Sequence, residues 1–228
     1  MEQNSSTERS FVLSYLGLRR AIGIIGFFLP FILALGKLVT DGPGIESSIS
    51  TYYYSGMRDV FVGAMCAIGV FLFSYRGYDK KDDMAGNLAS VFAIGLALVP
   101  TAPDFSQIPH EKLIGTIHLV LSSSFFLMLG YFCLFLFTKT NPDKIPTRQK
   151  LLRNRVYKVC GTLIVVALIL IVIVKQFPEN SEMMRLAPVF WLESVAVVAF
   201  GISWLTKGEA FLKDVPEHVE AGLVSGRE

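Results

Sequence analysis

The fold is decided by an apolar stretch that reads VVALILIVIV and covers residues 165–174. It contains no polar side chain, and it is part of a longer hydrophobic run over residues 156–175. A helix needs about 20 mainly apolar residues to cross a bilayer, and a helix that is apolar on every side has no face for water. The stretch therefore predicts a membrane-spanning helix that faces lipid.

Five more apolar runs of similar length lie on either side of this one. The chain of 228 residues is 52% hydrophobic and only 18% charged, whereas a typical soluble domain carries about 25% charged residues. We expect an all-α polytopic membrane protein whose six transmembrane helices form one bundle. The expected spans are residues 20–39, 58–75, 86–103, 113–138, 156–175 and 186–206.

The basic residues predict an orientation. Most of the 21 Lys and Arg residues lie in the N-terminal segment, in the second and fourth loops and in the C-terminal tail. Because cytoplasmic loops are enriched in Lys and Arg, we expect both termini to be cytoplasmic, in a bacterial inner membrane. The expected division is a cytoplasmic or interfacial segment (residues 1–19), a transmembrane domain (20–206) and a cytoplasmic tail (207–228).

Charge and cysteine content exclude several functions. A formal net charge of +2 is too small to indicate nucleic-acid binding. Cys66, Cys133 and Cys160 all fall within apolar runs and lack the spacing of a redox pair or a metal site. The chain also lacks the HxxxH or HExxH spacing that would place two metal ligands on one helix turn, so we predict no metal and no cofactor. The expected partners are membrane lipids, and the sequence leaves a homo-oligomer open.

Two ionisable residues, His118 and Glu193, interrupt the fourth and sixth apolar runs. A charge in hydrocarbon costs at least about 2.5 to 3.5 kcal/mol on insertion scales, so such residues usually face a bundle interior or a water-filled cavity. Counted from the outer helix ends, both lie roughly 8 to 11 Å deep. They mark either a functional site or an ion pair that holds two helices together.

The two loops expected on the outer side carry further polar residues. The first reads GIESSISTYYYSGMRD (residues 44–59) and ends in Arg58 and Asp59, which open the second span. The second contains Asp104, His110 and three prolines. Tyrosines also form aromatic belts at the headgroup level, so Tyr52, Tyr53 and Tyr54 have a second interpretation that involves no ligand.

These residues suggest an outer polar pocket that binds a lipid headgroup or another amphiphile. One alternative is a membrane-embedded hydrolase or transferase acting on lipid-like substrates, with His118 and Glu193 as acid and base and Asp59 or Asp104 as an orienting group. Another is a proton-coupled transporter, although the two halves of the sequence show no repeat. Whether the protein is an enzyme stays open. The candidate ligand-binding residues are Ser50, Tyr52, Tyr53, Tyr54, Arg58, Asp59, Asp104, His110, His118, Ser122 and Glu193.

Several short motifs resemble those of known membrane proteins. They are SIS at residues 48–50, SYRGYD at 74–79, Asn87, His118 and Glu193. Together they resemble the DRAM-type autophagy modulators, the GPI-anchor-remodelling membrane proteins and uncharacterised bacterial proteins of the same six-helix plan. The resemblance covers residues 20–206, and it implies six helices and action at membrane lipids or lipid-anchored molecules. It would also carry over the first-loop serines, Tyr75 and Arg76, whereas the triple tyrosine and the Arg58–Asp59 pair depart from the pattern.

Overall fold

The structure of the chain is a computed structural model. It describes residues 2–77, 79–102, 109–140, 146–178 and 181–213, with side chains from residue 15 onward. All regular elements within these residues are helical. They are α1 (Glu2–Thr40), η1 (Ser50–Tyr54), α2 (Arg58–Phe73), α3 (Lys80–Leu98), α4 (Pro109–Tyr131), η2 (Phe132–Leu136), α5 (Arg148–Val174), η3 (Met184–Leu186) and α6 (Pro188–Lys207).

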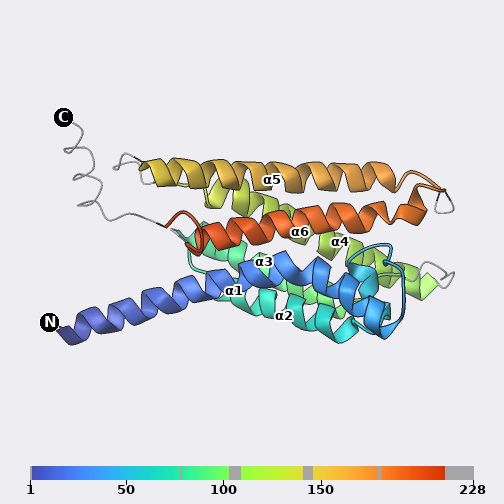
Figure 1. Cartoon of the computed structure of the whole chain (residues 1–228), viewed down its shortest axis with the longest axis horizontal. Helices are drawn as coiled ribbons and strands as arrows, with labels where there is room; N and C mark the ends of the chain where they lie inside the picture. The colour runs from blue at the N-terminus through green and yellow to red at the C-terminus, as the bar shows by residue number, and fades with distance from the viewer. Residues whose placement is uncertain (1, 78, 103–108, 141–145, 179–180, 214–228) are drawn as a thin grey trace.

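The six long helices pack in chain order and close on themselves. Each helix from α1 to α5 packs against the next one, and α6 packs against α1 as well as α5. Figure 1 shows the helices side by side, with the start of α1 and the end of α6 at the same end of the molecule. Most of the described Lys and Arg residues lie at this end, so we call it the basic end. We call the opposite end, where η1 lies, the η1 end. The predicted all-helical class is confirmed.

Four of these helices are long and apolar enough to cross a membrane. They comprise Tyr15–Thr40, Pro109–Leu136, Arg148–Val174 and Met184–Lys207, by length and composition. This is what an integral membrane protein requires. The other two helices fall short of that description, because α2 has only 16 residues and the first turn of α3 is charged.

The predicted third span, residues 86–103, has the wrong bounds. The Asp79 carboxylate accepts hydrogen bonds from the backbone N–H groups of Lys81 (2.9 Å) and Asp82 (3.0 Å). This is N-capping, which satisfies donors that the first helical turn leaves unpaired, so α3 begins at Lys80. Extended backbone at Val99 (ψ 111°) ends the helix, and the following Pro100 has no N–H with which to continue it.

Glycines allow close contact between α1 and α6. A Cβ on Gly201 would lie 2.5 Å from the backbone nitrogen of Phe27, and one on Gly23 would lie 2.7 Å from that of Leu205. Real Cβ atoms do not approach backbone so closely. Small residues at helix interfaces are typical of membrane bundles, because close packing replaces the hydrophobic effect there. This contact closes the ring of helices.

Candidate functional site

The segment between α1 and α2 folds over the start of α6 at the η1 end (Figure 1). Two backbone-directed hydrogen bonds hold it there. The N–H of Ile49 donates to Oε2 of Glu193 at 2.7 Å, and the N–H of Phe190 donates to the carbonyl of Ser47 at 3.1 Å. Glu193 therefore binds the backbone of the first loop. The sequence identifies Glu193 as a candidate site residue, but it does not indicate that its partner is the N–H of Ile49.

Hydroxyl groups fix the shape of this segment. The N–H of Ser48 donates to Oγ1 of Thr51 at 3.0 Å, and the N–H of Thr51 donates to Oγ of Ser48 at 3.2 Å. The Ser47 hydroxyl also lies 3.1 Å from Oγ1 of Thr51. Such reciprocal bonds satisfy the donors at the start of a helical turn. The serines of this loop thus build η1, which begins at Ser50.

The three consecutive tyrosines have different surroundings. Tyr52 is fully buried, with its ring centroid 5.9 Å from that of Phe190, and burial raises its pKa. Tyr54 is half exposed and donates its hydroxyl to the carbonyl of Thr101 at 2.7 Å. Tyr53 faces Arg58 instead. Of the three, Tyr53 lines a cavity formed by the described residues.

That cavity lies between α2 and α3 at the η1 end and has a volume of about 340 Å³. At one side, Arg58 donates from Nη2 to the Tyr53 hydroxyl at 2.6 Å, and its Cζ lies 4.3 Å from the centre of the Tyr53 ring. Asp59 lines the same space. The remaining lining is Val62, Gly63, Ala97 and Leu98. Three of the predicted ligand-binding residues thus share one cavity with an apolar wall.

His118 lies at the contact between α4 and α3. It is buried, and its Nδ1 is 2.6 Å from the carbonyl of Val99, the residue that ends α3. A carbonyl only accepts hydrogen bonds, so Nδ1 carries the proton of this bond. The other ring nitrogen, Nε2, is buried and has no hydrogen-bond partner among the described residues. Ser122, one turn later, donates its hydroxyl to the carbonyl of Leu119 at 3.1 Å.

His118 and Glu193 have separate partners in the structure. His118 binds the end of α3, and Glu193 binds the first loop. Within the described part of the chain, no hydrogen bond or ion pair joins the two. Lys175, which follows α5, is close enough to act electrostatically on both. Of the remaining predicted residues, His110 is exposed at the start of α4, and Asp104 lies outside the described residues.

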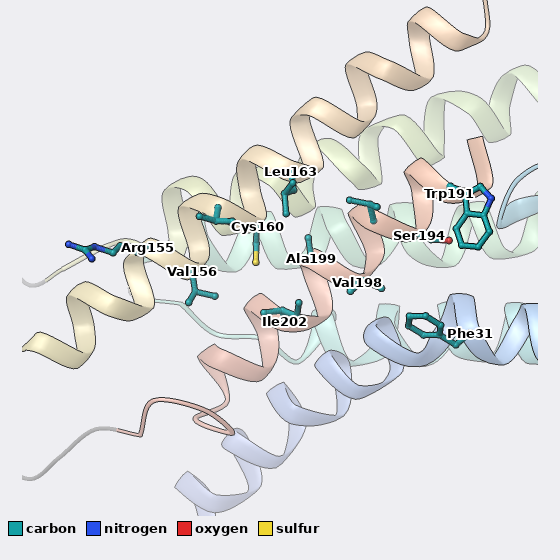
Figure 2. Close-up of a pocket in the computed structure, with 12 residues that line it drawn as sticks. Phe31, Arg155, Val156, Cys160, Leu163, Trp191, Ser194, Val198, Ala199 and Ile202 are labelled. Atoms are coloured by element: carbon teal, nitrogen blue, oxygen red, sulfur yellow. The ribbon is translucent and has the colours of Figure 1, made fainter. Parts of the chain in front are cut away.

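A larger hollow lies elsewhere, and sequence reasoning missed it. It has a volume of about 620 Å³ and runs along α6 between α5 and α1 (Figure 2). We call it the α5–α6 groove. Residues 165–174 of α5 are apolar all round, so the sequence indicates lipid contact but not where a neighbouring helix leaves a hollow. The lining residues are Phe31, Arg155, Val156, Val159, Cys160, Leu163, Trp191, Ser194, Val195, Val198, Ala199 and Ile202.

Three comparisons with known proteins bear on identity, and the arrangement of side chains bears on metal binding. No protein-family model, curated protein or solved structure matches this chain. The resemblance to DRAM-type and GPI-anchor-remodelling proteins therefore stays an expectation. In the part of the chain that the structure describes, no three His, Cys, Asp or Glu side chains lie together as they would around a metal ion.

Proposed function

We propose that this chain is a multipass membrane protein that binds the headgroup of a lipid, or another amphiphile, on the outer face of the membrane. The observation that supports the proposal is the cavity between α2 and α3, where Tyr53, Arg58 and Asp59 meet an apolar wall. Ligand sites typically join apolar lining to a few polar groups that fix orientation. An amphiphile has both kinds of surface.

The charges at this cavity favour a zwitterionic headgroup. The Arg58 guanidinium is a rigid fork of donors suited to a phosphate, and the Asp59 carboxylate accepts hydrogen bonds from an amine. Both residues are exposed, so they are accessible to a headgroup. Gly63 leaves open space, since nothing lies within 4 Å of where its Cβ would be. A phospholipid with a phosphate and an amine, such as phosphatidylethanolamine, fits these groups.

The proposal includes six membrane crossings with both termini in the cytoplasm. At 1.5 Å per residue, α2 and α3 extend about 24 and 28 Å, close to the ~30 Å hydrocarbon core. Both pack within the ring beside helices that are long enough to cross. Most of the described basic residues lie at the end opposite η1, and the positive-inside rule makes that end cytoplasmic. The cavity then opens on the outer side.

Catalysis by His118 and Glu193 has less support. A general acid and base must lie within hydrogen-bond reach of the reacting group, directly or through one water. Each of these residues instead binds backbone from a different segment. Neither lines the α2–α3 cavity or the α5–α6 groove. The transporter hypothesis has no further observation in its favour.

Lipid analysis of purified variants tests the headgroup site. Wild-type protein extracted in mild detergent is expected to retain phosphatidylethanolamine, quantified by mass spectrometry of the extracted lipid. Gly63→Leu fills the cavity and Arg58→Gln removes its cation, so each should lower the retained amount. Arg185→Gln is the matched control, because Arg185 is exposed and pairs with Glu182 at 3.1 Å, away from the cavity. Equal retention in all four proteins would refute the site.

A further inference from the structure

The α5–α6 groove has the length of a single acyl chain in one leaflet. It follows α6 from Trp191 to Ile202, which at 1.5 Å per residue is about 16 Å. The hydrocarbon core of a bilayer is about 30 Å thick, so one leaflet contributes roughly half of that. Figure 2 shows α6 along the groove, with side chains of α5 on one side and Phe31 of α1 on the other.

The groove offers almost no polar atom to an occupant. Its floor includes Ser194, but that hydroxyl already donates to the carbonyl of Phe190 at 2.7 Å. Cavities lined by apolar side chains stay free of water. A polar ligand would lose its hydrogen bonds here. The occupant is therefore a hydrocarbon chain.

One end of the groove is cationic and the other is aromatic. Arg155 lies at the basic end and points away from the lining residues, along α5, whereas Trp191 and Phe31 lie at the opposite end (Figure 2). Lys158 follows Arg155 by three residues, which places both on one side of α5. Both are exposed, and neither forms an ion pair with a described residue. Long basic side chains of this kind extend to the headgroup level.

We propose that the α5–α6 groove holds one acyl chain of an anionic phospholipid, with the lipid phosphate bound by Arg155 and Lys158. Packing in the groove alone gives little preference for one lipid over another, because all lipid tails are as apolar as the residues around them. The charge supplies the selectivity, since each Lys or Arg near an anionic headgroup contributes an attraction. This site is independent of the α2–α3 cavity, which lies on other helices.

Native mass spectrometry of the full chain, with equal amounts of phosphatidylglycerol and phosphatidylcholine, tests the site. Wild type is expected to retain phosphatidylglycerol preferentially. Removing both cations (Arg155→Gln with Lys158→Gln) should weaken retention by roughly five-fold per cation. These side chains are exposed, so the variant is expected to fold. Lys80→Gln with Lys81→Gln, also exposed at the basic end but on α3, is the matched control.

A second pair of variants tests whether the acyl chain of the lipid lies in the α5–α6 groove. Leu163→Trp places a large ring in the groove, whereas Ile169→Trp places it on α5 outside the groove. The two residues are 43% and 55% exposed, so neither change disturbs the core. Leu163→Trp should lose phosphatidylglycerol, and Ile169→Trp should keep it.

Several results would overturn this site. They are equal retention of the two lipids by wild type, unchanged retention when both cations are removed, and unchanged retention in Leu163→Trp. A dimer that retains no lipid and dissociates in Leu163→Trp would show that a second copy of the chain fills the groove instead. Arg58→Gln, which changes the α2–α3 cavity, should leave phosphatidylglycerol retention unchanged.

Discussion

At the scale of single residues, Glu193 is where the first loop attaches to α6. Its carboxylate accepts the N–H of Ile49, a buried residue 144 positions earlier in the chain. A buried backbone donor without a partner loses the hydrogen bonds that water would give it. Glu193 therefore has a structural role at the η1 end, whatever ligand binds nearby.

Replacing this carboxylate should separate its two properties, the hydrogen bond and the charge. Glu193→Ala leaves the Ile49 N–H unpaired and is expected to cost about 1–3 kcal/mol of stability. Glu193→Gln keeps an acceptor oxygen and should cost clearly less. Unfolding in detergent measures both, with the exposed Glu182→Ala as control. If Glu193→Gln loses as much stability as Glu193→Ala, the hydrogen bond to the Ile49 N–H does not have the role given to it here.

The sequence predicted the exceptional residues better than their partners. A histidine and a glutamate inside apolar runs are visible without a structure, because charge in hydrocarbon is costly. Their partners, the Val99 carbonyl and the Ile49 N–H, are backbone groups. Every residue except proline has both groups, so no residue type indicates them. Tyr53, Arg58 and Asp59 are close in sequence and share a cavity, but the sequence grouped them with His118 and Glu193, which do not line it.

At the scale of elements, the start of α3 depends on Asp79. Hydrogen bonds from the N–H groups of Asp82 and Lys81, together with the ammonium group of Lys139 at 3.1 Å, lower the pKa of the Asp79 carboxyl. A carboxyl with a lowered pKa stabilises the folded state above its ordinary pKa. That contribution is lost as the pH falls through the folded-state value.

A pH series on Asp79→Asn should detect this effect. Asparagine is a good N-cap, so the variant keeps the helix start but loses the charge. Wild type should have the higher melting temperature at neutral pH. The difference should shrink below about pH 4, the ordinary range of an aspartate. A difference that stays constant from pH 7 to pH 3 would contradict the role of the carboxylate charge.

The contact between α1 and α6 makes a sharp prediction for glycine replacement. A Cβ on Gly201 would meet the backbone of Phe27, which cannot move aside as a flexible side chain can. Gly201→Ala is expected to destabilise the protein by about 1–3 kcal/mol through overpacking. Gly17→Ala is the control, because nothing lies within 4 Å of its added Cβ. Equal melting temperatures for the two variants would show that α1 and α6 are not held this closely.

At the scale of the whole molecule, the apolar runs predicted all six helices. Helices that cross a membrane satisfy their own backbone hydrogen bonds. The length of an apolar run is therefore a strong indication of a helix. The bounds of α3 were harder to predict, since capping by Asp79 extended it into a charged segment. The α5–α6 groove could not be predicted, because it depends on how far apart neighbouring helices lie.

The proposed orientation can be tested with single cysteines. Arg185→Cys lies at the η1 end and Lys80→Cys at the basic end, both in a Cys66→Ser background; the other two native cysteines are buried. A membrane-impermeant thiol reagent added to intact cells should label Arg185→Cys but not Lys80→Cys. Labelling of both should follow permeabilisation. The reverse pattern in intact cells would place the α2–α3 cavity on the cytoplasmic side.

The headgroup site is tested most directly by an experimental structure of the full chain in nanodiscs containing phosphatidylethanolamine. We expect headgroup density in the α2–α3 cavity, with the phosphate within hydrogen-bond distance of Arg58 and the amine near Asp59. The same measurement on Gly63→Leu should show the cavity without that density. An empty cavity in wild type, with a lipid headgroup instead beside His118 and Glu193, would contradict the proposed site.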